Sequence, residues 1–114
     1  MKSEFLDYVE DIIEAMDNAM SFTGTMKYEE FVEDRKTVYA VIRAIEIIGE
    51  AVKRIPESIK SRYQQIPWRD MAGMRDKLIH EYFGVDPRAV WDTVKKDTPK
   101  LRPLFERILN ELEK

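Results

Sequence analysis

Apolar residues recur along the chain at the three- and four-residue spacing that is typical of one-sided α-helices. The first such stripe predicts a helix that begins at Ser3-Glu4 and ends near Thr23-Gly24. A second helix is expected from about Asp34 to Ile55, and its apolar stripe is wide enough to contact more than one neighbour. No segment shows the period-two alternation of a strand, so the pattern predicts helices almost throughout.

Proline and glycine mark the element boundaries in the rest of the chain. Asp86-Pro87 and Asp97-Thr98-Pro99 each combine a capping residue with a proline suited to a first helical turn, and Gly84 suits a helix end. The remaining expected elements are a turn at 28–32, a short helix or turn at 58–63, and helices from 67 or 68 to about 82, from 87 to 96 and from 98 to 112.

These elements predict an all-α fold, an antiparallel bundle of four to five helices. The length of 114 residues allows one hydrophobic core, and the sequence contains no internal repeat or linker-like tract. We therefore expect residues 1–114 to form a single helical domain.

Composition removes several classes of site and location. The chain has no cysteine and one histidine, which excludes thiol chemistry and leaves no metal cage of histidines within one subunit, so no metal or cofactor is expected. No apolar run is long enough for a membrane span, and the first residues lack the apolar core of a signal peptide. A cytoplasmic protein is the expectation.

Charge is distributed unevenly along a chain whose overall net charge is −3. Residues 1–34 carry two cations and ten acids, whereas residues 53–80 carry seven cations and three acids. An anionic ligand should therefore prefer the middle of the chain. The alternative is that the acidic face of one helix pairs with a basic face elsewhere in the fold.

Arg75 falls in the middle of the apolar stripe of the helix expected at 67–82. A guanidinium there must be paired, or must face a cleft or a subunit interface, because an unpaired buried charge is costly. Asp76 and His80 are expected as an i, i+4 pair at the edge of that stripe, where the carboxylate could orient the imidazole. A purely structural alternative pairs Arg75 with Glu46 or Glu50 and leaves Asp76 and His80 as an ordinary boundary pair.

The segment Gly73–Asp86 contains Arg-x-x-x-x-His-x-Tyr, formed by Arg75, His80 and Tyr82. This motif resembles the signature of the HEPN superfamily in its HepT-like branch. The resemblance extends through residues 39–56, 66–68 and 90–94, from the second expected helix into the helix expected at 87–96. It implies an all-α bundle that forms a homodimer and acts as the toxin of a toxin–antitoxin pair. The implied partner is a minimal nucleotidyltransferase of the MntA-like kind.

The resemblance also implies a metal-independent endoribonuclease that acts on RNA. Attack by the ribose 2′-OH needs a base, an acid and stabilisation of the phosphorane. His80 suits the proton transfers, because imidazole has an unperturbed pKa near 6.5, and Arg75 suits the phosphate. Asp76 is assigned the role of orienting the His80 imidazole. One histidine per chain cannot be acid and base at once, so the mechanism requires a site shared by two subunits.

The resemblance assigns Tyr82 as the hydroxyl that the cognate transferase modifies with AMP, although an ordinary interface aromatic is the alternative. Basic residues around the motif could extend an RNA-binding rim, and a solvated charged face is the alternative for each of them. The RNA-binding residues we expect are Lys53, Arg54, Arg69 and Lys77, with Lys60 and Arg62 as further members of the rim. Trp68 and Trp91 could stack on bases, but their positions are also those of core residues.

Two other functional hypotheses are compatible with these residues. In the first, the chain is a non-catalytic subunit of a two-component nucleotidyltransferase that binds nucleotide or docks the transferase, with Arg75 on a phosphate. In the second, the chain is a purely structural dimer in which Arg75 pairs with Glu46.

Overall fold

The computed structural model describes residues 4–80 and 84–113, and of Ile79 and His80 it describes the backbone alone. Its first helix, α1, spans Glu4–Thr23 and buries one apolar face, as predicted. Gly24 follows with φ of +48°, the left-handed conformation that ends many helices, and its N–H donates to the carbonyl of Met20 at 2.9 Å. The first helix and its predicted end near Thr23-Gly24 are therefore confirmed.

Helix α3, Arg35–Lys53, corresponds to the second predicted helix. Asp34 caps it by accepting from the backbone N–H of Thr37 at 3.1 Å and from its hydroxyl at 2.8 Å. The segment predicted as a turn at 28–32 is instead a short helix, α2, at Tyr28–Glu33. Glu30 stabilises this helix because its carboxylate accepts from the N–H of Lys27 at 2.8 Å, a local signal that the turn prediction did not use.

The single helix predicted at 67–82 is wrong. After α4, Glu57–Arg62, the chain forms α5 at Trp68–Ala72 and α6 at Met74–Leu78, separated by Gly73. Strand β1, Ile79–His80, then pairs antiparallel with β2, Gly84–Val85, and the N–H of Asp86 donates to the carbonyl of Leu78 at 2.7 Å. This pairing competes with continuation of the helix, and Gly84 with φ of +78° suits the return of the chain.

The predicted break at Asp97-Thr98-Pro99 is also wrong. Helix α7, Pro87–Asp92, begins at the Asp86 cap as predicted, with the Asp86 carboxylate accepting from the N–H of Ala89 at 3.1 Å. It continues through a π-helical segment, η1 at Thr93–Asp97, into α8 at Thr98–Leu112. Asp97 makes no capping bond, and the Thr98 hydroxyl instead donates to the Thr93 carbonyl at 2.9 Å. The wider turn accommodates the chain before Pro99 without ending the helix.

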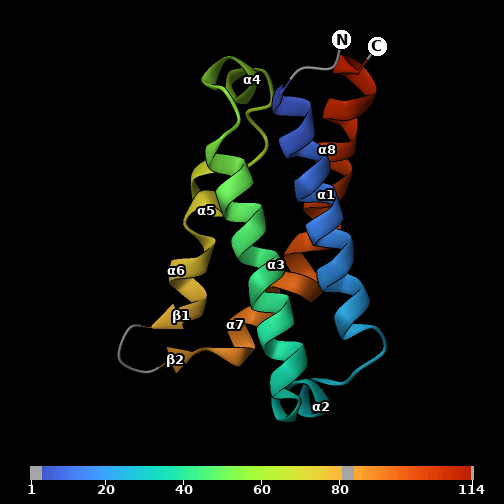
Figure 1. The fold of residues 1–114 in the computed structure, drawn as a ribbon, viewed down its shortest axis with the longest axis vertical. Helices are drawn as coiled ribbons and strands as arrows, with labels where there is room; N and C mark the ends of the chain where they lie inside the picture. Colours follow the sequence, from blue (N-terminus) through green and yellow to red (C-terminus); the bar gives the residue numbers. More distant parts are fainter. Residues whose placement is uncertain (1–3, 81–83, 114) are drawn as a thin grey trace.

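Helix α3 lies at the centre of the fold, between α1 on one side and α5 and α6 on the other (Figure 1). Its buried side chains join those of α1, α6, α7 and α8 in one hydrophobic cluster, so the all-α prediction is confirmed. The central position explains the wide apolar stripe of α3, because a helix with several neighbours must be apolar on several sides. Within the described part of the chain, no helix is long and apolar enough to cross a membrane.

Ion pairs and side-chain hydrogen bonds connect α8 to the rest of the bundle. Arg102 donates to both carboxylate oxygens of Asp17 on α1, at 2.6 and 3.1 Å, so the acidic first helix does pair in part with a basic residue elsewhere. The Tyr63 hydroxyl donates to Glu111 at 2.7 Å. Burial and this contact raise the pKa of Tyr63, whereas hydrogen bonds from Arg107 and Tyr63 lower the pKa of Glu111.

The capping role of Asp34 gives a first test of the fold. Asp34→Ala removes the acceptor for the first turn of α3, and we expect the Tm to fall by roughly 4 °C, the usual consequence of losing a helix cap in a domain of this size. Asp97→Ala is the matched control, because Asp97 precedes α8 without a capping bond. Thermal unfolding followed by circular dichroism measures both variants, and equal effects would contradict the assignment.

The same comparison should depend on pH. Hydrogen bonds from the hydroxyl and the N–H of Thr37 hold the pKa of Asp34 below its ordinary value of 3.8. A lowered folded-state pKa means that the stabilisation is fully present above the unfolded-state pKa and is lost as the pH falls through the folded-state pKa. The Tm difference between the wild type and Asp34→Ala should therefore be constant near neutral pH and shrink below about pH 4.

Candidate active site

Arg75, on the short helix α6, faces Glu46 on the central helix α3. The Nε of Arg75 donates to Oε2 of Glu46 at 2.8 Å, and 55% of the Arg75 side chain is exposed to solvent against 28% of Glu46. The sequence predicted that Arg75 lies within an apolar stripe, where its guanidinium must be paired or must face a cleft or a subunit interface. The structure pairs it with one of the two expected partners and leaves about half of its side chain exposed.

Glu46 also attracts a second guanidinium. Nη1 of Arg43 lies 4.0 Å from Oε1 of the same carboxylate, and 70% of the Arg43 side chain is exposed. One partly buried carboxylate therefore holds two exposed guanidiniums on neighbouring helices, and this arrangement suits a ligand with a phosphate group. Arg43 was missed by the sequence interpretation. The signal that could have found it is the Arg43-x-x-Glu46 spacing, which places the two side chains on one helix face.

His80 does not share a helix with Asp76. Helix α6 ends at Leu78, and the backbone of His80 lies in β1, paired with Gly84. The helical i, i+4 geometry expected for Asp76 and His80 is therefore wrong, because a strand does not follow the 100° step of a helix. Asp76 is exposed on α6 beside Arg75. The side chain of His80 and all of Tyr82 lie outside the described residues.

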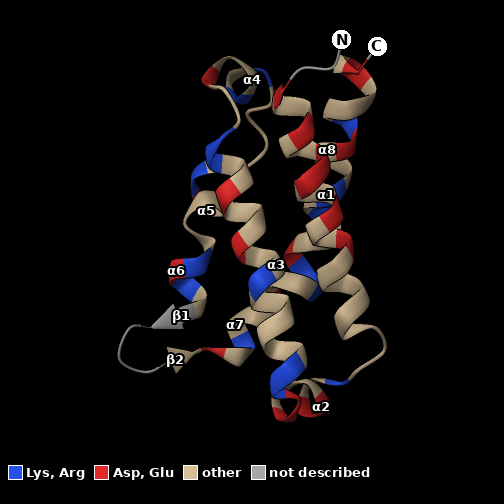
Figure 2. Ribbon diagram, viewed as in Figure 1, with Lys and Arg blue, Asp and Glu red and all other residues tan. Residues whose placement is uncertain are grey.

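The four cations expected to bind RNA lie on several sides of the motif. Lys53 is 3.6 Å from Glu50 at the end of α3, and Arg54 lines a groove between α1 and α3. Arg69 is exposed on α5, whereas Lys77 lines a pocket between α6 and the α7–η1–α8 segment. Figure 2 shows Lys and Arg positions on α4, α5 and α6 along one side of the molecule, with acidic positions among them. The structure therefore does not gather all four cations beside Arg75.

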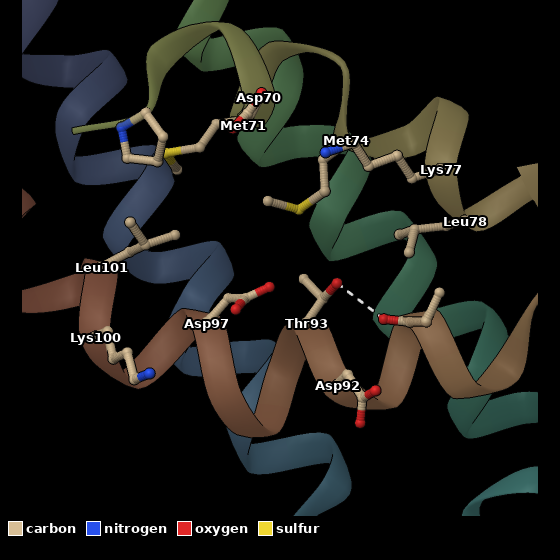
Figure 3. Close-up of a pocket in the computed structure, with 12 residues that line it drawn as sticks. Asp70, Met71, Met74, Lys77, Leu78, Asp92, Thr93, Asp97, Lys100 and Leu101 are labelled. Atoms are coloured by element: carbon tan, nitrogen blue, oxygen red, sulfur yellow. Dashed lines mark hydrogen bonds between the residues drawn. The ribbon is translucent and has the colours of Figure 1, made fainter.

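A mostly apolar pocket of about 400 Å³ lies under the motif helix (Figure 3). Met71, Met74 and Leu78 line it from α5 and α6, and the Asp97 carboxylate points into it from η1. One side of helix α6 therefore packs against α3, where Arg75 contacts Glu46. Another side of α6 lines the pocket, which side chains do not fill. Such loose packing favours local movement of a short helix.

Among residues 4–80 and 84–113, no group of three or more His, Cys, Asp or Glu side chains is placed to hold a metal ion. The described side chains around Glu46 instead offer positively charged hydrogen-bond donors. Arg75 and Arg43 present guanidinium donors to solvent, and such donors match the oxygens of a phosphate.

Comparison with known proteins places this arrangement in a family. The family model described as ribonuclease HepT-like matches residues 12–108, a range that includes the whole motif. A protein of Thermococcus cleftensis named "Probable ribonuclease HepT" is 55% identical over 95% of this chain and 98% of its own length. A protein of Methanocaldococcus jannaschii named "Putative RNase MJ0125" is 48% identical over 98% of this chain and 97% of its own length.

A search of solved structures found no match. The family match covers more than half of the chain, and the two relatives are similar to it over almost their whole lengths. The resemblance inferred from Arg75, His80 and Tyr82 is thereby confirmed at the level of the family. This chain belongs to the ribonuclease HepT-like family of the HEPN superfamily.

Proposed function

We propose that this protein is a metal-independent endoribonuclease, the toxin of a HEPN-type toxin–antitoxin pair in the cytoplasm. The observation that carries the proposal is the exposed side chain of Arg75, in an Arg-x-x-x-x-His-x-Tyr motif that lies within the range matched by the family model. Glu46 engages the Nε of Arg75, and more than half of the side chain remains exposed. The Nη donors of such a guanidinium can grip the oxygens of an RNA phosphate.

The proposed reaction is an internal transesterification. The ribose 2′-OH loses its proton to a base and attacks the neighbouring phosphorus, and the bond from phosphorus to the 5′-oxygen breaks as that oxygen takes a proton from an acid. The products are a 2′,3′-cyclic phosphate and a 5′-hydroxyl. His80 carries the proton transfers, Arg75 stabilises the phosphorane, and Asp76 on α6 supports the orientation of His80 from outside the strand.

A two-fold dimer supplies the second histidine that one chain lacks. Each chain has one histidine, so two subunits must contribute to one cleft if both an acid and a base are imidazoles. The face of α3 that carries Glu46 and Arg43 also exposes Tyr39, a large side chain that is 54% accessible. An exposed tyrosine on the same helix face as the guanidiniums supports a subunit contact beside the proposed site.

The proposed antitoxin is a minimal nucleotidyltransferase of the MntA-like kind, which attaches AMP to Tyr82. The added phosphate and base would occupy the space before Arg75 and block RNA. Co-expression with the transferase from the neighbouring reading frame should shift the intact mass by one or more AMP groups, and Tyr82→Phe should abolish the shift. Tyr39→Phe is the matched control, since Tyr39 is also exposed. Modification that persists in Tyr82→Phe would remove this part of the proposal.

A second candidate function is a non-catalytic subunit that binds nucleotide or docks the transferase. The exposed side chains of Arg75 and Arg43 are compatible with it, because they can bind a nucleotide phosphate without any catalysis. Under this alternative, the purified protein leaves RNA intact while the transferase still modifies or binds it. A purely structural dimer predicts that Arg75→Met is neutral or stabilising and that the protein has neither activity, and the absence of both activities distinguishes it from the other two.

A further inference from the structure

An open groove of about 520 Å³ runs between α4 and α5, apart from the contact between Arg75 and Glu46. Its lining combines an aromatic ring, two cations and several groups that can hydrogen-bond to a base edge. The lining residues are Glu57, Lys60, Ser61, Gln64, Trp68, Arg69 and Ala72. None of the functional roles described above uses this groove as a whole.

Trp68 is fixed at the groove by contacts on its other edges. Its Nε1 donates to the backbone carbonyl of Tyr63 at 3.1 Å, and its ring packs edge-on against the buried Phe105 at 5.5 Å between centroids. The side chain is nevertheless only partly buried, and Nζ of Lys60 lies 6.0 Å from its ring centroid. A rigid aromatic ring beside a flexible cation is a combination that accepts a stacked base and its phosphate.

We propose that this groove is a nucleotide subsite for single-stranded RNA, in which a base stacks on Trp68 and the adjoining phosphates contact Lys60 and Arg69. The inference rests on the proposed ribonuclease function and adds a place where the substrate is held outside the reacting bond. The Gln64 amide and the Glu57 carboxylate can hydrogen-bond to base edges. Because Glu57 repels phosphate, the backbone runs on the side of the groove formed by Lys60 and Arg69.

The position of the groove connects it to the motif. Helix α5 leads through Gly73 directly into α6, which carries Arg75. The basic positions of α4, α5 and α6 lie along one side of the molecule (Figure 2), so a strand held in the groove can continue past these cations toward Arg75. An aromatic platform with cations on the path of the backbone is how proteins bind single strands with little sequence preference.

Tryptophan fluorescence tests the stacking contact directly. The full-length chain with His80→Ala and Trp91→Phe keeps Trp68 as its one tryptophan, and Trp91 can be replaced conservatively because it packs against the aromatic rings of Tyr28 and Phe31. Titration with a single-stranded RNA twelve nucleotides long is expected to quench the emission of Trp68. The reciprocal protein, His80→Ala with Trp68→Phe, keeps Trp91 and should show no comparable quenching.

The cations are tested by the salt dependence of binding of the same RNA to the His80→Ala protein. Lys60→Ala and Arg69→Ala should each weaken binding a few-fold and reduce the slope of log affinity against log salt by about 0.7, the value for one phosphate of a single strand. Lys96→Ala is the matched control, an exposed lysine on η1 that lies 3.6 Å from Asp92.

Binding of RNA without quenching of Trp68, or equal slopes in Lys60→Ala, Arg69→Ala and Lys96→Ala, would overturn the subsite and leave the ribonuclease proposal standing. Absence of any RNA binding by the His80→Ala protein, together with absence of cleavage by the wild type, would overturn both. The two failures are therefore distinguishable.

Discussion

His80→Ala is expected to reduce RNA cleavage by about 10²–10⁴-fold, the usual contribution of a positioned general acid or base. The loss should be large because both histidines of a dimer would disappear together, and no other imidazole is available in the chain. Cleavage of a fluorescent RNA by purified protein measures it. Circular dichroism serves as the folding control, since β1 pairs with β2 through its backbone and the substitution leaves that pairing in place.

The result that would contradict the role of His80 is unaltered turnover in His80→Ala beside an active wild type. An inactive wild type with RNA left intact would instead favour the non-catalytic alternative. In that case, the discriminating observation is whether the transferase and ATP still modify the protein.

Arg75→Ala should lower cleavage by about 10²–10³-fold, as expected when one donor to a charged transition state is removed. Stability should change little, because ion pairs as exposed as that between Arg75 and Glu46 contribute about 0–1 kcal/mol. Arg75→Ala should therefore lose cleavage activity while its stability stays close to that of the wild type. A purely structural role for Arg75 also predicts that Arg75→Met is neutral or stabilising, so unchanged cleavage is the result that would support it.

Arg102→Ala is the control for this comparison. Arg102 bridges α8 to Asp17 on α1 through two hydrogen bonds and also contacts Glu106 at 2.7 Å, and 31% of its side chain is exposed. Its loss should lower the Tm more than the loss of Arg75, while the cleavage rate of the folded protein is retained. Equal losses of cleavage in Arg75→Ala and Arg102→Ala would show that the effect of Arg75 is not specific.

Local signals in the sequence predicted the helix boundaries where capping chemistry decides them. Asp34 and Asp86 cap the helices that follow, and Gly24 ends α1, as their residue types indicate. The prediction failed where tertiary pairing or an unusual turn decides the backbone. The segment after Leu78 pairs as a two-stranded hairpin, and the turn at Asp97 is absorbed into a π-helical segment, neither of which has a distinct hydrophobic period.

The same limits apply to the contacts of the candidate site that the sequence could predict. The polar positions within apolar stripes indicated that Arg75 and Glu46 could pair, and the structure confirms this contact. The helical geometry expected for Asp76 and His80 depended on one uninterrupted helix, so it failed when α6 proved to end at Leu78. The sequence left open whether Trp68 stacks on bases or fills the core. The structure shows a partly buried side chain whose Nε1 donates to the Tyr63 carbonyl and whose ring packs against Phe105.

The most direct test of the central claim is cleavage by the purified wild-type protein in the presence of EDTA. A single-stranded RNA and the same strand with 2′-deoxyribose at the cleaved positions are compared, and the product ends are identified by mass spectrometry. The account predicts metal-independent cleavage of the RNA to 2′,3′-cyclic phosphate ends and no cleavage at the deoxy positions. Loss of activity with EDTA, or equal cleavage of the two strands, would contradict it.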